Sequence, residues 1–209
     1  CKPEANSSIE VLLDEIKKHP SLTYDEIARL AGQKSITSLI KSLVGKKAII
    51  LFHRGHEHSD RMAHLVDELK LTDFDFFAWD ARGHGDSPGT RGDAPSFSAC
   101  VKDIQYFLQH IQHQYGIDEN NIAIIGQSVG AVLSATWVHD YAPKIRALCL
   151  ASPAFDIKLY VPFAEPGLRV LNHIKGNFFI QSYVKSSMLT HDKERAQTYD
   201  TDPKIARSI

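Results

Sequence analysis

The sequence has no long apolar run, almost no net charge and few cysteines. Its 209 residues contain no apolar stretch approaching the ~20 residues that cross a membrane, and no signal peptide is visible. A net charge of −1 gives no overall attraction to nucleic acid or an anionic membrane. The three cysteines show neither metal-ligand spacing nor an even-numbered disulfide framework, so we expect a reducing compartment, the cytoplasm. Cys149 lies in an apolar run and is predicted to be in the core.

Neither end of the sequence has the features of a natural terminus. The chain does not begin with Met, so we expect residue 1 to be a processed or cut end. An N-terminal Cys followed by a polar tether is also typical of a mature bacterial lipoprotein, but an arbitrary fragment boundary is favoured. At the other end, the chain stops at Ile209 without a closing element.

A Gly-x-Ser-x-Gly motif follows a short apolar run and precedes a stretch of good helix formers. The motif is Gly126-Gln-Ser-Val-Gly130, between a predicted strand at 122–125 and a predicted helix at 131–139. A serine on such a tight strand-to-helix turn has a strained backbone and a hydroxyl lifted clear of the sheet. The N–H of Val129 can then face a developing oxyanion. The motif predicts Ser128 as a nucleophile, although a Gly/Ser-rich turn without chemistry has the same pattern.

Apolar runs and amphipathic stretches alternate along residues 46–156. The predicted strands are 46–52, 74–79, 122–125 and 146–151. Helices between them predict an α/β fold with a doubly wound, mostly parallel sheet and right-handed crossovers. Ligands bind such sheets at the carboxyl ends of the strands, where the loops 53–58 and 80–89 and Ser128 all fall. Residues 157–209 lack a sheet period, and we expect a partial cap that shields chemistry from water.

Three short helices are predicted in residues 1–45. Apolar residues recur there at helical spacing, a capping box begins at Thr23, and Gly32 and Gly45 lie near helix ends. The tight glycine-containing turn between the last two helices resembles a helix-turn-helix. Basic residues are few, so we favour a small helical packing unit and do not expect nucleic acid as a partner.

Three motifs in this order resemble the α/β-hydrolases of the monoacylglycerol lipase and serine-aminopeptidase-like group. They are His53-Arg-Gly-His-Glu-His-Ser59, Trp79-Asp-Ala-Arg-Gly-His-Gly-Asp-Ser-Pro-Gly89 and Gly126-Gln-Ser-Val-Gly130. The resemblance covers about residues 46–209 and is strongest to the hydrolase half of bacterial hydrolase–methyltransferase fusion proteins. It implies an α/β-hydrolase sheet, incomplete here, and a serine esterase or lipase. The implied substrate is a small acyl or lipid ester, as for a lysophospholipase or monoacylglycerol lipase, with no cofactor.

The resemblance assigns roles to individual residues. Ser128 matches the nucleophile, and the backbone N–H groups of Val129 and Gly55 match the two donors of the oxyanion hole. The family usually has small residues beside the second donor, where this chain has an arginine and a histidine. The candidate substrate-binding residues are Arg54, His56 and Gln127.

Other residues of the first two motifs are expected to support loops. The resemblance makes His53 and His58 loop-bracing residues, so we expect no metal on the three closely spaced histidines of the first motif. His84 and Asp86 are predicted to structure their own loop, and Arg82 to anchor loop backbone.

The chain departs from the family pattern in two places. The helical segment stands where the family has a pair of antiparallel strands, and the chain ends where the family's catalytic acid and histidine would follow. His139 is about three helical turns from Ser128, and His173 and His191 match no motif. Asp156 could act as an acid in a variant arrangement. Since a serine hydroxyl without its base is a weak nucleophile, we expect impaired activity.

Two further expectations follow from the incomplete pattern. The alternative to an enzyme is a non-catalytic binding or regulatory protein, with a helix-turn-helix-like N-terminus on a degenerate hydrolase fold. A sheet cut short also leaves an exposed apolar edge, so we expect a homodimer through that edge.

Overall fold

The computed structural model describes residues 45–156, 164–176, 178–179 and 184–208. The chain divides into two compact units, Cys1–Lys47 and Ala48–Ile209, and the description below concerns the second. The helices predicted near the N-terminus fall in residues 1–44, outside the described residues. Within the described ranges, no helix has both the length and the apolar character to cross a membrane.

The centre of the second unit is a four-stranded sheet with the order β2-β1-β3-β4. The strands are β1 (Lys47–Phe52), β2 (Phe74–Ala78), β3 (Ile122–Gln127) and β4 (Ala147–Ala151). Strand β3 pairs in parallel with β1 on one side and with β4 on the other. Every strand lies within two residues of its predicted position, which confirms the α/β, mostly parallel fold.

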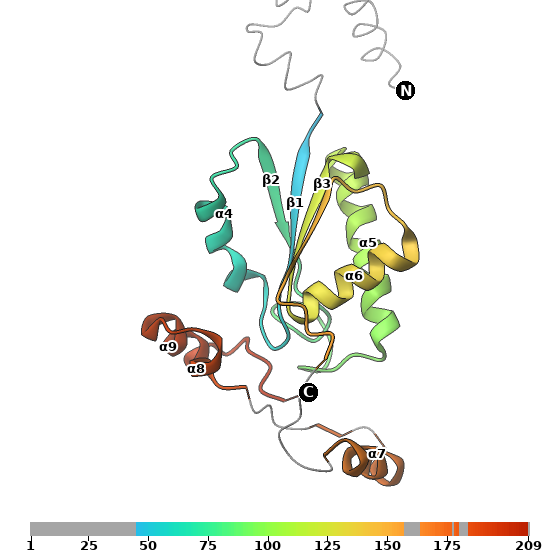
Figure 1. The fold of residues 1–209 in the computed structure, drawn as a ribbon, viewed down its shortest axis with the longest axis vertical. Helices are drawn as coiled ribbons and strands as arrows, with labels where there is room; N and C mark the ends of the chain where they lie inside the picture. Colours follow the sequence, from blue (N-terminus) through green and yellow to red (C-terminus); the bar gives the residue numbers. More distant parts are fainter. Residues whose placement is uncertain (1–44, 157–163, 177, 180–183, 209) are drawn as a thin grey trace, which may run out of the picture. The chain divides into compact units, whose positions relative to one another are not determined.

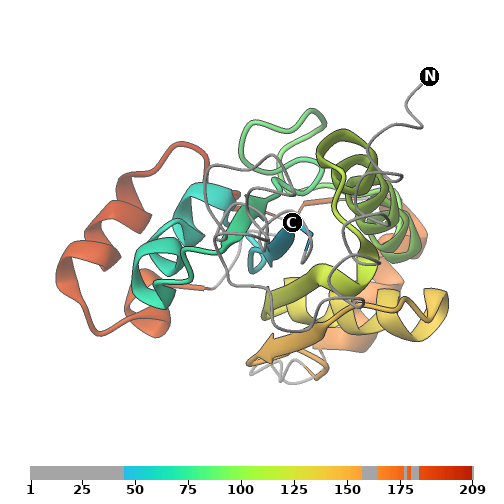
Figure 2. The same cartoon turned by 90° about the horizontal axis from the view of Figure 1, so that it is seen from above.

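Helices cover both faces of this sheet (Figure 1; Figure 2). The helices are η1 (Ser59–Met62), α4 (His64–Leu69), α5 (Phe97–Tyr115), η2 (Glu119–Asn121), α6 (Val129–Tyr141), α7 (Ala164–Lys175), α8 (Ser186–Leu189) and α9 (Lys193–Thr201). Helix α4 lies on one side of the sheet, and α5 and α6 lie on the other (Figure 1). Helix α5 begins at Ser96, whose side chain accepts the Ala99 N–H, and it ends at Gly116 in the left-handed conformation. The described part of the predicted cap is helical.

The strand order reverses between β1 and β3. The chain runs from β1 out to β2, then crosses back past β1 to reach β3. The ends of the two strands are level, because Phe52 pairs with Gly126. The loop after β1 and the turn after β3 therefore meet at the point where doubly wound sheets bind ligands.

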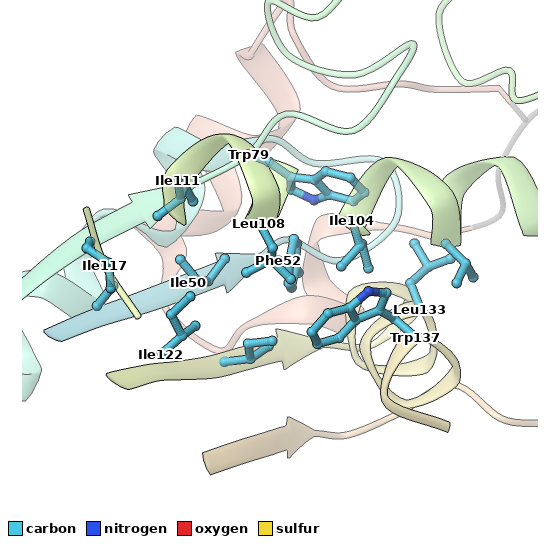
Figure 3. Close-up of a cluster of buried hydrophobic side chains, with 13 residues drawn as sticks. Ile50, Phe52, Trp79, Ile104, Leu108, Ile111, Ile117, Ile122, Leu133 and Trp137 are labelled. Carbon is cyan, nitrogen blue, oxygen red and sulfur yellow. The ribbon is translucent and has the colours of Figure 1, made fainter. Parts of the chain in front are cut away.

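The main core fills the space between the sheet and α5 and α6 (Figure 3). Phe52 of β1 packs edge-to-face against Trp79, with ring centroids 4.9 Å apart. Trp137 of α6 is fully buried, and its indole N–H donates to the side-chain oxygen of Gln105 at 2.7 Å. This side holds β1 and β3 rigidly together, so it fixes the distance between the loops that follow them.

The α4 face of the sheet is covered more thinly. Its buried cluster is small, with Ile49, Leu51 and Met62, and Ile125 packs against it only partly buried. Cys149 pairs with Ile125 in the register of β3 and β4 but is exposed. The prediction that it is in the core was wrong, because an apolar run does not show that β4 lies at the edge of the sheet. Within the described residues the outer edge of β4 pairs with no strand, and the homodimer stays a prediction.

Candidate active site

Ser128 lies on the turn between β3 and α6 with φ 53° and ψ −113°. A positive φ is uncommon for a residue with a side chain, and here the surrounding hydrogen bonds hold it. The Ser128 N–H donates to the carbonyl of Ala151 at 2.9 Å. Its own carbonyl accepts from the N–H groups of Ala131 at 3.1 Å and Ala154 at 3.3 Å. The turn is therefore fixed to both β4 and α6.

The two glycines of the motif allow a close approach of backbone to backbone. A Cβ atom on Gly130 would lie 2.5 Å from the carbonyl oxygens of both Phe52 and His53. A Cβ on Gly126 would lie 2.7 Å from the carbonyl oxygen of Gly130. Real Cβ atoms do not approach backbone this closely, so only glycine lets α6 begin directly against the end of β1.

The residues predicted to form the oxyanion hole lie side by side. Gly55 comes from the loop after β1, and Val129 is the first residue of α6. A Cβ on Gly55 would lie 3.2 Å from a methyl carbon of Val129. The first N–H groups of a helix have no partner inside it, so that of Val129 remains available to an anion. The structure thus brings together Ser128, Val129 and Gly55.

His53 connects the loop after β1 to the loop after β2. Its Nε2 accepts the Ala81 N–H at 3.0 Å, so the ring proton is on Nδ1, which donates to the carbonyl of Arg54 at 2.7 Å. Burial, with a smaller contribution from the nearby His84, lowers the pKa of His53 to about 4. The neutral ring is what this geometry requires, because a second ring proton would face the Ala81 N–H.

Asp80 joins the same two loops through its carboxylate. One oxygen accepts the Ser59 N–H and the other the Asp86 N–H, each at 2.7 Å. Burial alone raises the pKa of Asp80, but these donors outweigh it and hold the pKa below its ordinary value. Gly85, with φ 52°, lies so close to the carboxylate that a Cβ there would collide with it. Sequence reasoning did not single out Asp80.

A third element, the return segment (residues 202–208), holds the loop after β1. His56 Nδ1 lies 2.7 Å from the Ala206 carbonyl, and the Ala206 N–H donates to the His56 carbonyl at 2.9 Å. His58 Nε2 donates to Asp202 at 2.7 Å. Lys204 binds Asp86 at 2.6 Å. The sequence gave no signal for these contacts.

Two residues of the second motif, His84 and Arg82, bind different kinds of partner. His84 Nδ1 lies 2.9 Å from the Arg82 carbonyl, within its own loop. Arg82 was predicted to anchor loop backbone, which was wrong. Its guanidinium forms two hydrogen bonds, at 2.6 and 2.7 Å, to the carboxylate of Asp103 on α5. A guanidinium and a carboxylate match in geometry and can form two parallel hydrogen bonds, which explains why Arg82 binds Asp103 and not loop backbone.

A cavity of about 400 Å³ opens on the α4 face, and we call it the Arg54 cavity. Of the three candidate substrate-binding residues, Arg54 and Gln127 line it. His56 does not line it and is nearly buried, and burial lowers its pKa. Ser128 is outside the lining, so the cavity lies beside the serine rather than over it.

The structure does not assemble a base for the serine within the described residues. There, no histidine hydrogen-bonds the Ser128 hydroxyl. His139 is 87% exposed and binds its neighbour Asp140. His173 and His191 are exposed, as is Asp156. In the same residues, no cluster of three metal-ligating side chains occurs.

We expect Gly130→Ala to destabilise the protein by at least roughly 3 kcal/mol. The backbone carbonyls of Phe52 and His53, at the end of β1, cannot move away from the added methyl group. Chemical unfolding followed by circular dichroism measures this. The matched control is Gly167→Ala, also in a helix but with nothing within 4 Å of the added atom. That change should be neutral or stabilise by up to about 1 kcal/mol. Equal effects of the two changes would contradict the close approach.

We expect the free energy of unfolding to fall as the pH drops from about 6.5 to 4. His53 binds a proton near pH 6.5 when unfolded but only near 4 when folded, so unfolding takes up a proton in this window. The shift amounts to roughly 3 kcal/mol. His53→Gln keeps an acceptor for Ala81 but cannot be protonated, and should reduce the slope measured by unfolding at several pH values. His139→Gln, at an exposed position, should leave the slope unchanged, and an unchanged slope in His53→Gln would refute the assignment.

Comparison with known proteins identifies the family. Residues 45–209 match the family described as serine aminopeptidase, S33. The uncharacterized protein YnbC of Escherichia coli K12 is 54% identical over 164 residues, which are 78% of this chain and 28% of that protein. Monoglyceride lipase of Mus musculus is 29% identical over 167 residues, covering 78% of this chain and 54% of the lipase.

Solved structures agree with this assignment at the level of the fold. The monoacylglycerol lipase of Paleococcus ferrophilus has a TM-score of 0.66 at 24% identity, over 79% of this chain and 63% of that one. A soluble variant of monoglyceride lipase from Saccharomyces cerevisiae has a TM-score of 0.63 at 18% identity, over 78% of this chain and 55% of that one. The chain spans about half the length of the curated lipases that it matches. It belongs to the serine aminopeptidase S33 family of α/β-hydrolases and is similar to the monoglyceride lipases.

Proposed function

We propose that this chain carries the nucleophile and the oxyanion hole of a serine esterase or lipase acting on a small acyl or lipid ester. The observation that carries the proposal is the strained turn at Ser128, with Val129 and Gly55 next to each other beside it. Membership of the hydrolase family and the likeness to monoglyceride lipases support ester hydrolysis and a monoacylglycerol-type substrate.

In the proposed reaction, the Ser128 oxygen attacks the carbonyl carbon of the ester, and a base accepts the hydroxyl proton. The carbonyl oxygen becomes an oxyanion that accepts hydrogen bonds from the N–H groups of Val129 and Gly55. The C–O bond to the alcohol then breaks, and the alcohol leaves with the proton. Water hydrolyses the acyl-serine in the same way, releasing the carboxylic acid and restoring the hydroxyl.

The base is the missing part of this arrangement. Without one, a serine hydroxyl is a weak nucleophile, and an oxyanion hole with substrate binding retains only ~10³–10⁴-fold acceleration over water. We therefore propose that this chain alone reacts slowly. The support for this is that, within the described residues, no proton acceptor bonds the Ser128 hydroxyl.

We expect a fluorescent fluorophosphonate to label Ser128 slowly, and free imidazole to accelerate the labelling by roughly tenfold. A freely diffusing base replaces only part of the ~10²–10⁴ that a positioned base contributes. Labelling rates are read from gel fluorescence, and intact mass counts the adducts. Ser128→Ala should show no labelling with or without imidazole, whereas Ser98→Ala, at an exposed serine on α5, should match the unmodified chain.

Two results would count against the proposal. Equal labelling of Ser128→Ala and the unmodified chain would show that another residue reacts. No labelling of a folded sample, even with imidazole, would show that the serine turn carries no nucleophile and would favour the non-catalytic alternative.

A further inference from the structure

The lining of the Arg54 cavity combines apolar and charged residues. Met62, Leu65, Ile125 and Leu189 are among its apolar residues, and Arg54 and Glu57 are among the charged ones. Its volume of about 400 Å³ lies within the range of small-molecule sites in proteins. A lining that is in part apolar and in part charged suits an amphipathic ligand.

Part of the charged lining is an ion cluster of two partly buried arginines on one buried carboxylate, with an excess of positive charge. Arg54 Nη2 donates to Glu57 Oε1 at 2.7 Å, and Arg61 Nε lies 3.7 Å from the same oxygen. The Glu57 side chain is only 3% exposed, so solvent does little to screen the cluster. Two guanidinium groups share one carboxylate, which leaves one positive charge uncompensated within the cluster.

Of the two arginines, Arg54 is the one left short of acceptors. Arg61 also donates to the Thr198 hydroxyl at 3.1 Å and to the Arg195 carbonyl at 3.3 Å. The Arg54 guanidinium makes a single hydrogen bond within the described residues, the one to Glu57, and its buried Nε has no partner there. A buried guanidinium with unused donors is costly unless an acceptor is supplied. The remaining exposed part of Arg54, 20% of its side chain, is available to the cavity.

We infer that the Arg54 cavity binds a medium-chain carboxylate, with its head on Arg54 and its tail against Met62, Leu65 and Leu189. A carboxylate brings one negative charge, which balances the cluster, and its two oxygens match the guanidinium fork. A phosphate monoester carries −1.5 to −2 charges and would place excess negative charge beside Glu57. The inference does not require Ser128 to be a nucleophile.

The test is isothermal titration of the full chain with decanoate and, separately, with decanol, both below the concentration at which they aggregate. We expect saturable one-to-one binding of decanoate and at least tenfold weaker binding of decanol, since only the acid pairs with Arg54. Arg54→Gln should remove the difference between the two ligands. Arg146→Gln, which removes an exposed guanidinium outside the cavity, should leave it unchanged.

The comparison of decanoate with decanol on the unmodified chain needs no variant, so it tests the inference even if Arg54→Gln does not fold. Absence of saturable decanoate binding, equal affinity for the two ligands, or an unchanged preference in folded Arg54→Gln would each overturn the inference. Ser128→Ala should bind decanoate as the unmodified chain does. A failure of the proposed hydrolase chemistry can therefore be told apart from a failure of decanoate binding.

Discussion

The contact between the start of α6 and the end of β1 sets the geometry of the whole site. Gly130 lies directly against the carbonyls of Phe52 and His53, with no room for a Cβ atom. The register that pairs Phe52 with Gly126 brings the two strand ends level, and the core behind them prevents either from sliding. The strained turn at Ser128 and the meeting of Gly55 with Val129 both follow from this one close approach.

The loops above that contact are held by side chains that bond backbone. His53 and Asp80 both receive backbone N–H groups, and burial favours the neutral form of both, yet only the histidine stays neutral. Burial lowers the pKa of His53, whereas the two donors that face the Asp80 carboxylate outweigh burial and keep its pKa low. His56 and Asp202 add a second set of links from a distant part of the chain. Together these hydrogen bonds hold Gly55 in one position, whereas a loop without them would leave that position variable.

Local patterns in the sequence predicted the strands and the tight turn at Ser128, because each depends on neighbouring residues, whereas the place of Gly55 beside Val129 came from the family resemblance. Contacts across about 150 residues, such as His56 with Ala206, have no such local signal. The exposure of Cys149 depends on where the sheet ends, which its own strand does not encode. Helix α7 was not predicted from the sequence, and Pro166 and Gly167 both lie in its first turn, where proline is tolerated.

The backbone at Ser128 also bears on the two meanings of the motif. A positive φ on a residue with a side chain costs of order 1–3 kcal/mol. This chain holds that conformation with bonds to Ala151 and Ala154 and leaves room for it with glycine on both sides. The turn places the serine directly before the N-terminus of α6. Under the proposed function this strain has a use, because it sets the nucleophile at the start of that helix.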